Sequence, residues 1–249
     1  MIASDRMEKD VYYQDIEIHF FDCDSRKKVK LSTIMKYIAD IAGIDYEKKG
    51  YTHQVLWEMG MVFLLSKVSI DVRRRPMDDE IITLSTWERG TKGAQFFRSF
   101  EWLDQSGEIV VSADTSWLLV NPETRKILRP SVFEKPMPRK EDKLPGCRPP
   151  EKLHLHAGMV PAATREVRYS DLDGNGHVYN AVYGDIAIDQ LPHEWQTKDF
   201  TSFMINFNHE ATLGDTLTLY TARSSDDIWQ VSGETEHGPC FACEIRFEG

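Results

Sequence analysis

The stretch RYSDLDGNGHVYNA at residues 168–181 matches an earlier stretch, HFFDCDSRKKVKLS at residues 19–32, without a gap. Each stretch carries two aspartates separated by one residue, namely Asp22 and Asp24 in the first and Asp171 and Asp173 in the second. Such a pair before a helix is most simply a turn, because Asp side chains accept hydrogen bonds from nearby backbone N–H groups. The match predicts two copies of one structural unit.

Each copy continues with a predicted helix and a series of strands. In the first copy apolar residues recur at helical spacing over 31–42, with Ser32 as the expected N-cap. Strands rich in β-branched and aromatic residues are predicted next, at 62–72, 81–87, 95–103 and 109–120. In the second copy a short strand ends at Tyr169 and a helix carries Val178 and stops at Leu191. Its further strands are predicted near 201–208, 215–223, 228–234 and 240–247.

The segment between the two copies is rich in proline and charge. Prolines occupy positions 136, 138, 145, 149 and 150 among lysines, arginines and acidic residues. This composition predicts a linker at 134–154, between an N-terminal domain at 1–133 and a C-terminal domain at 155–249. A helix wrapped by a curved antiparallel sheet, present twice, predicts an α+β fold of two tandem hotdog domains.

Composition and charge exclude several classes of function. The net charge of −10 argues against general nucleic-acid binding, which needs a basic face to neutralise phosphates. No apolar run approaches the roughly 20 residues that span a bilayer, and the N-terminal residues do not resemble a signal peptide. Four cysteines are too few and too scattered for a disulfide framework. A cytoplasmic location is therefore expected.

A calcium loop is one interpretation of DLDGNG at residues 171–176, which fits the first half of the EF-hand pattern. The second half fails, because the twelfth position requires a bidentate Glu and is Val182. Two weaker metal-binding pairs, His154 with His156 and Cys240 with Cys243, have no third ligand nearby in the sequence. No metal site is predicted.

A catalytic turn is the other interpretation. Asn175 and His177 stand where the first copy has Arg26 and Lys28, so these polar groups are special to the second copy. Asp173 precedes them with the same alternation, and an extended segment would point all three side chains to one side. The alternative is that Asn175 caps the helix and His177 is packed in the core.

The turn also predicts an oxyanion site made by the backbone. Gly174 and Gly176 allow close approach of the chain to a ligand. A helix that starts here would offer free N–H groups and a partial positive charge, with Gly176, His177 and Val178 as the expected donors.

A second candidate acid lies at the end of a predicted strand. In FMINFNHEATLGD at 203–215, apolar residues alternate and then give way to polar residues that include Glu210. The overlay of the two copies sets Arg73 or Arg74 opposite Glu210, so this acid too belongs to the second copy alone.

Five segments, in order and over nearly the whole chain, resemble the acyl-acyl-carrier-protein (acyl-ACP) thioesterases of bacteria and plants. They are KLSTIMKYIADIAG, SKVSIDVRRRPMDDEIITLSTW, SWLLVNPETRKILRP, DLDGNGHVYNAVYGD and INFNHEATLGDTLTLY. The resemblance implies two tandem hotdog domains, no cofactor, and hydrolysis of fatty acyl thioesters in fatty acid biosynthesis. It also implies a D-x-N-x-H motif with a downstream acid, which maps onto Asp173, Asn175, His177 and Glu210.

One departure from the family bears on the mechanism. Some plant members carry a Cys beside the downstream acid, whereas Ala211 and Thr212 follow Glu210 here. A covalent cysteine mechanism is therefore disfavoured, and water is the expected nucleophile. Glu210 or Asp173 would activate that water with help from the amide and the imidazole, and the sequence leaves open which carboxylate is the base.

The substrate is expected to use two further regions. The apolar stretch WEMGMVFLL at 57–65 could line an acyl slot. An acidic carrier protein would dock on a basic patch, whose expected members are Lys27, Lys28, Lys30, Arg73, Arg74 and Arg75. The alternatives are an acyl-CoA thioesterase, a hotdog dehydratase or hydratase, and a non-catalytic acyl-binding module. Either a monomer or a homodimer is compatible with two internal hotdog domains.

Overall fold

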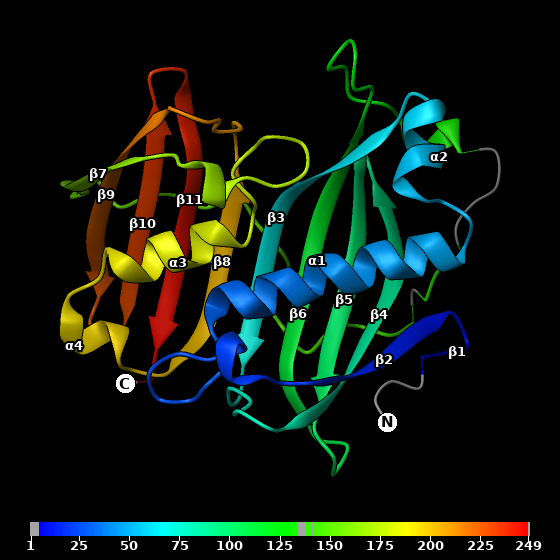
Figure 1. Cartoon of the computed structure of the whole chain (residues 1–249), viewed down its shortest axis with the longest axis horizontal. Coiled ribbons are helices and arrows are strands. Elements are labelled where there is room, and N and C mark those ends of the chain that lie inside the picture. Colours follow the sequence, from blue (N-terminus) through cyan, green and yellow to red (C-terminus); the bar gives the residue numbers. More distant parts are fainter. Residues whose placement is uncertain (1–4, 134–137, 141, 249) are drawn as a thin grey trace.

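The computed structural model describes residues 5–133, 138–140 and 142–248. Its centre is one antiparallel sheet of 11 strands with the order β1-β2-β4-β5-β6-β3-β8-β11-β10-β9-β7. The two halves of the chain join where β3 pairs with β8, and Figure 1 shows α1 and α3 lying across the same face of the sheet. Each half is thus a helix covered by its own part of a curved antiparallel sheet, and the predicted α+β tandem hotdog fold is confirmed.

The elements follow the same plan in each half. The N-terminal half contains β1 (Arg6–Glu8), β2 (Val11–Glu17), η1 (Phe20–Asp22), α1 (Leu31–Lys48), α2 (His53–Glu58), β3 (Val62–Val72), β4 (Ile81–Lys92), β5 (Gln95–Leu103), β6 (Ile109–Val120) and η2 (Pro130–Val132). The C-terminal half contains β7 (Val160–Glu166), η3 (Tyr169–Asp171), α3 (Val182–Asp189), α4 (His193–Gln196), β8 (Phe200–Phe207), β9 (Thr216–Ser225), β10 (Ile228–Thr235) and β11 (Gly238–Phe247).

One hydrophobic core runs through both halves. Along α1 the buried residues Ile34, Ile38 and Ile41 recur at intervals of three and four, which places them on the face that packs against the sheet. The two helices meet near their N-terminal ends. A Cβ atom on Gly184 would lie 3.2 Å from the Ser32 backbone nitrogen, so glycine permits this close approach. The shared core fixes the two halves relative to each other.

The strand predictions of the first half are confirmed at 62–72, 95–103 and 109–120, while the strand predicted at 81–87 extends to Lys92 through a bulge between Glu88 and Gly90. The two predicted helix starts are wrong. Ser32 lies inside α1, whose N-cap is Lys30. The second helix begins at Val182 because the backbone N–H of Val178 donates to Ala211 and closes a loop instead.

The predicted linker at 134–154 lies partly outside the described residues, which omit 134–137 and 141. The described remainder contains no helix or strand. It is held to the sheet at separate points: the Trp87 indole donates to the Lys143 carbonyl at 2.9 Å, and Arg148 donates to Ser202 at 3.0 Å. The domain boundaries themselves remain a prediction.

Within the described part of the chain, no helix is both long enough and apolar enough to cross a membrane.

Candidate active site

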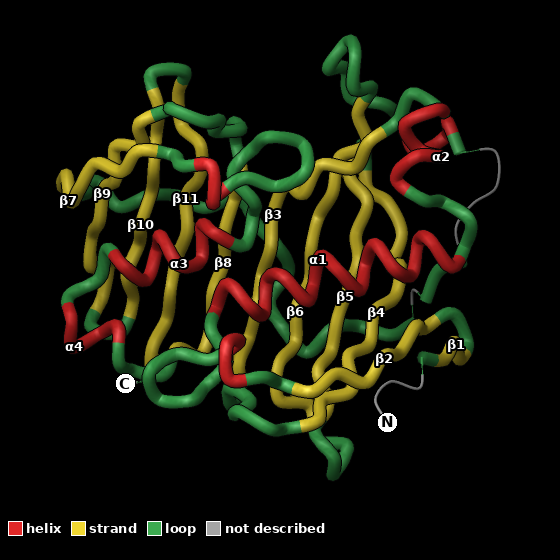
Figure 2. The backbone as a smooth tube through the Cα atoms, viewed as in Figure 1, coloured by secondary structure: helices red, strands yellow, loops and turns green. Residues whose placement is uncertain are grey.

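The two loops that the sequence overlay paired have the same hydrogen bonds. In the second copy the backbone N–H of Asn175 donates to the Asp173 carboxylate at 2.8 Å. In the first copy the backbone N–H of Arg26 donates to the Asp24 carboxylate, also at 2.8 Å. The second aspartate of each pair therefore acts as a turn-forming acceptor, as predicted. Figure 2 shows the two loops at opposite ends of the strands, one before α1 and one before α3.

The loop before α3 meets the segment that follows β8. The Val178 N–H donates to the Ala211 carbonyl at 2.9 Å, and an isolated antiparallel bridge pairs His177 with Thr212. This pairing brings Glu210 beside the loop, with its Oε2 atom 3.5 Å from His177 Nε2. Two polar groups that are 33 residues apart in the sequence thus face each other.

A cavity of about 700 Å³ opens at this point. Asn175, His177 and Glu210 line it, and the predicted alternative of a core-packed His177 does not hold. Asp173 is not among the described residues that line the cavity. Its carboxylate serves the loop instead, because Oδ1 accepts the backbone N–H groups of Asn175 at 2.8 Å and of His177 at 3.3 Å. The four predicted residues are therefore neighbours, but only three of them face the cavity.

The predicted backbone oxyanion donors are already bonded within the protein. The Gly176 N–H donates to the Asp173 carbonyl at 3.0 Å, the His177 N–H to the Asp173 carboxylate, and the Val178 N–H to Ala211. The helix whose free N–H groups were expected here starts only at Val182. The prediction that these three N–H groups bind an oxyanion is therefore wrong.

Two residues that the sequence analysis missed also line the cavity. Asn180 lies beside the loop, and its side-chain amide makes no hydrogen bond to any other described residue. Arg125 comes from the hairpin after β6 and donates to Glu210 Oε2. Asn180 was hidden in the predicted helix, and Arg125 is 85 residues from Glu210, a separation at which spacing carries no signal.

The cavity extends from these polar groups into the N-terminal half. The stretch at 57–65, predicted to form an apolar slot, contributes Trp57, Met61, Val62, Phe63 and Leu64, and the preceding Leu56 also lines the cavity. The helix α1 contributes small residues, namely Ala39, Ala42 and Gly43. Together they make a predominantly apolar lining, of the kind that holds an aliphatic ligand.

A buried charged cluster forms part of the cavity wall in the N-terminal half. Arg98, whose side chain is 2% exposed, donates to Glu88 at 2.7 Å and to Asp45 at 2.8 Å, and the Tyr46 hydroxyl donates to Glu88 at 2.8 Å. Desolvation alone would lower the pKa of Arg98, but the neighbouring Glu88, Tyr46 and Asp45 outweigh it and raise that pKa above its usual value. The guanidinium therefore stays charged in the interior.

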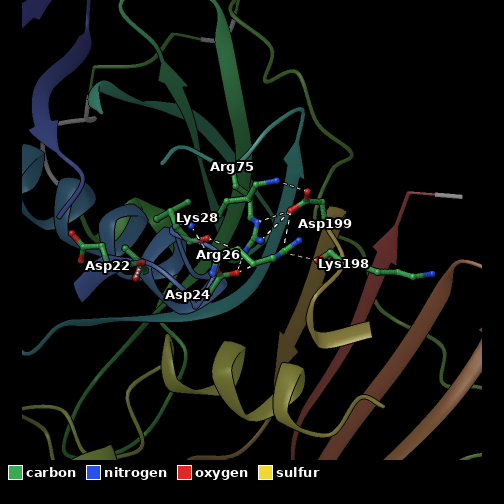
Figure 3. Close-up of polar contacts among 9 residues, drawn as sticks. Asp22, Asp24, Arg26, Lys28, Arg75, Lys198 and Asp199 are labelled. Carbon is green, nitrogen blue, oxygen red and sulfur yellow. Dashed lines mark hydrogen bonds and ion pairs between the residues drawn. The ribbon is translucent and has the colours of Figure 1, made fainter. Parts of the chain in front are cut away.

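Figure 3 shows the charged residues around the loop of the first copy, at the place that corresponds to His177 and Glu210 in the second copy. The Val29 N–H donates to the Pro76 carbonyl as Val178 does to Ala211, so Arg75 and not Arg73 or Arg74 is the counterpart of Glu210. Arg75 pairs with Asp24 at 2.8 Å and with Asp199 at 3.0 Å. The first copy thus holds an ion-pair network where the second copy holds the cavity.

This network also corrects the predicted docking patch. Lys28 pairs with Asp199 at 2.5 Å, Arg75 pairs as above, and Arg74 pairs with Glu80 at 2.8 Å. Lys27, Lys30 and Arg73 have no ion pair with another described residue. Three of the six cations predicted as one basic patch are therefore neutralised by ion pairs, and the other three are not.

The cysteines give no support to covalent chemistry. Burial raises the pKa of Cys240 and raises that of Cys243 to about 12, which disfavours the reactive thiolate. Among the described residues, no cysteine lines the cavity, and no group of three His, Cys, Asp or Glu side chains is arranged to hold a metal ion.

Comparisons with known proteins agree with this architecture. The structure of an acyl-ACP thioesterase from Bacteroides thetaiotaomicron superposes with a TM-score of 0.84 over 97% of this chain and 100% of that one, at 22% identity. The 12:0-ACP thioesterase from Umbellularia californica gives a TM-score of 0.80 over 98% and 99% of the two chains, at 15% identity. At these identities the likeness shows the fold.

Sequence relatives and family models point the same way. A chloroplastic palmitoyl-acyl carrier protein thioesterase from Cuphea hookeriana is 22% identical over 237 residues, which are 85% of this chain and 54% of that protein. The chain thus spans about half the length of the curated relatives it matches. The acyl-ACP thioesterase N-terminal domain model matches residues 9–132, and the C-terminal domain model matches residues 161–247. The chain belongs to the acyl-ACP thioesterase family.

Proposed function

We propose that this protein hydrolyses the thioester of a fatty acyl chain carried on acyl carrier protein and releases the free fatty acid in fatty acid biosynthesis. The observation that carries the proposal is the meeting of Glu210 and His177, 3.5 Å apart, at a largely apolar cavity of about 700 Å³. The cavity offers room for an aliphatic chain, and the polar pair lines the part of it in which the reacting carbonyl would bind.

In this proposal Glu210 is the general base. A carboxylate that activates water must face the reacting group, and Glu210 lines the cavity. Asp173 is a positioning residue, because it holds the backbone of Asn175 and His177 in the loop. The geometry thus favours one of the two carboxylates that the sequence left open.

The proposed reaction proceeds through a tetrahedral intermediate. Water loses a proton to Glu210 while its oxygen forms a bond to the thioester carbon. The Asn180 amide, which has no other partner in the described chain, donates to the carbonyl oxygen as it becomes negative, and Asn175 and His177 orient the water. The C–S bond then breaks, and the proton passes by way of Glu210 or His177 to the sulfur. The products are a fatty acid and a free thiol.

The test is whether thiol and fatty acid appear together. Purified protein is mixed with acylated acyl carrier protein, the thiol is followed with a colorimetric reagent, and the fatty acid is quantified by mass spectrometry. Equal amounts of both are expected. A change in the acyl chain without thiol release would mean a hydratase or dehydratase, and tight binding without any product would mean an acyl-binding module.

A substitution at Gly43 tests whether the acyl chain occupies the cavity. An added Cβ atom at this position, in the interior of α1, would meet no heavy atom within 4 Å, so Gly43 faces open space. Gly43→Leu is expected to stabilise the fold by up to about 1 kcal/mol, because glycine is a poor helix former. The same side chain is expected to raise KM for a hexadecanoyl substrate more than for an octanoyl substrate.

Gly43→Ala is the matched control for that experiment. It gives at least as much helical stabilisation while adding a single carbon to the cavity. Urea unfolding measures the stability of both variants, and steady-state kinetics measures KM for the two chain lengths. An equal change in KM for both substrates with Gly43→Leu would contradict the placement of the chain.

A further inference from the structure

The hairpin after β6, residues 121–129, is a hydrogen-bonded projection next to the candidate active site. The backbone N–H of Asn121 donates to the Lys126 carbonyl at 2.9 Å, and the Asn121 carboxamide oxygen accepts the Thr124 N–H at 2.8 Å. The Asn121 amide donates to the Gly60 carbonyl at 3.1 Å, which ties the hairpin to the segment after α2. Figure 1 shows the hairpin, in green, rising above the upper ends of the strands.

The hairpin touches the site through Arg125. Its guanidinium donates to Glu210 and lines the cavity with it. Lys126 is the next residue, and Arg129 is four residues from Arg125, a separation of at most about 15 Å. Both cations are therefore carried on the same short hairpin as the residue that contacts Glu210.

The outer surface of the hairpin combines free positive charge with an apolar side chain. Lys126 and Arg129 are exposed, and neither forms an ion pair with another described residue. Ile127, between them, is 57% exposed. Glu123 is the acidic residue of the same hairpin, and Lys126 and Arg129 together outweigh its charge. The free charge of the hairpin is therefore positive, in a chain whose net charge is −10.

The thiol arm of the substrate limits where a carrier can dock. About 13 bonds separate the thioester sulfur from the phosphorus of a phosphopantetheine arm, which is about 17 Å when extended. The strand β3 runs from Val62, which lines the cavity, to Val72, which precedes Arg73–Arg75. Its 11 residues span about 33 Å, roughly twice the length of the arm. Arg73–Arg75, which follow the far end of this strand, therefore lie farther from its cavity end than the extended arm reaches.

We propose that the hairpin at 121–129 is the surface on which an acidic carrier protein docks, with Lys126 and Arg129 meeting carboxylates and Ile127 providing an apolar contact. This rests on the proposed function. The charges are complementary to an acidic partner, and such surfaces act mainly by raising the rate of productive encounter. Docking here sets the arm at the polar end of the cavity.

The experiment compares two charge reversals on two substrates. Lys126→Glu combined with Arg129→Glu tests the hairpin. Lys27→Glu combined with Arg73→Glu is the matched control, from the opposite end of the strands. Arg125 is left intact because it contacts Glu210. Each protein is assayed with acylated carrier protein and with the corresponding acyl-pantetheine, which lacks both carrier and phosphate.

The hairpin variant is expected to lose about tenfold or more in kcat/KM on the acylated carrier, through KM, and to lose most of the salt dependence of that reaction. Its kcat/KM on acyl-pantetheine is expected to match wild type, and the control variant is expected to match wild type on both substrates. An equal loss by the control, or a loss on acyl-pantetheine as large as that on the carrier, would overturn the docking surface. Wild-type protein that hydrolyses neither substrate would instead overturn the proposed function.

An assay with acyl-CoA identifies the source of the negative charge. If the hairpin variant loses activity on acyl-CoA as strongly as on the acylated carrier, the hairpin recognises the phosphates of the thiol arm, and the carrier surface is not the partner. If acyl-CoA hydrolysis stays within about twofold of wild type while carrier hydrolysis falls, the protein surface of the carrier is the partner.

Discussion

Replacing Glu210 with glutamine is expected to lower kcat about 10²- to 10⁴-fold, the usual contribution of a general base. Glutamine keeps the size of the side chain and a hydrogen-bond acceptor for Arg125, but it cannot take a proton from water. Because Glu210 is partly exposed at the cavity and outside the core, the fold is expected to survive. Steady-state hydrolysis of acyl-pantetheine measures the effect, with circular dichroism as the check on folding.

Two companion substitutions separate the base from the groups around it. Asp173→Asn is expected to lower kcat no more than about tenfold, because the Asn oxygen can still accept the loop N–H groups at a cost of about 1 kcal/mol. Asn180→Ala is expected to lower kcat about 10²- to 10³-fold with little change in KM, as for the loss of one oxyanion donor. If Asp173→Asn abolished turnover while Glu210→Gln retained it, the assignment of the two carboxylates would be reversed.

The repeated turn explains why so much of the fold could be predicted from the sequence. Hydrogen bonds within the turn are local, since Asp173 and Asp24 bind N–H groups two to four residues away. Strand predictions succeeded for the same reason, because local runs of β-branched and aromatic residues suit a buried pleated surface, and β3 and β5 are buried at several consecutive positions. Features with a short range in sequence leave a readable pattern.

Features that depend on the packing of distant segments left no such pattern. The start of α3 moved to Val182 because Ala211, 33 residues after Val178, captures an N–H that would otherwise begin the helix. The contact of Arg125 with Glu210 joins the two halves of the chain. Asp199 reaches the first copy's loop in the same way and neutralises cations that the sequence presented as free. The candidate site could therefore be located from sequence, while its partners could not.

The two copies show how one backbone carries two different electrostatic environments. In the first copy Lys28 and Arg75 occupy the places of His177 and Glu210, and Asp199 completes an ion-pair network. Desolvation raises the pKa of Asp199, but hydrogen bonds from Lys28 and Arg75 outweigh it and lower that pKa below its usual value. The network therefore contributes stability at neutral pH that is lost as the pH falls through the folded-state pKa. The same turn binds Asp199 of the other half of the chain in the first copy, and it lines the cavity in the second copy.

Replacing Arg98 with methionine is expected to destabilise the fold by about 3 to 5 kcal/mol, the usual cost of removing one partner of a buried ion pair. The substitution leaves Glu88 without its guanidinium, and Asp45 retains only Lys49, at 2.7 Å. One oxygen of Asp45 already has no hydrogen-bond partner among the described residues, so little compensation is available. Urea unfolding at neutral pH, analysed with the slope m as well as the midpoint, measures the loss.

Two controls make that measurement specific to the buried charge. Combining Arg98→Met with Glu88→Leu removes Arg98 together with one of its two carboxylate partners, and Asp45 keeps Lys49. The double variant is expected to be less destabilising than Arg98→Met alone, because Glu88 is no longer a buried carboxylate without its cation. Arg74→Met removes ion pairs with Glu80 and Asp104 from an Arg side chain that is 43% exposed, and it is expected to cost no more than about 1 kcal/mol. A loss for Arg98→Met as small as that for Arg74→Met would mean that water reaches the cluster through the cavity and screens it. The wall of the cavity would then be hydrated, and an acyl chain would have to displace that water in order to bind.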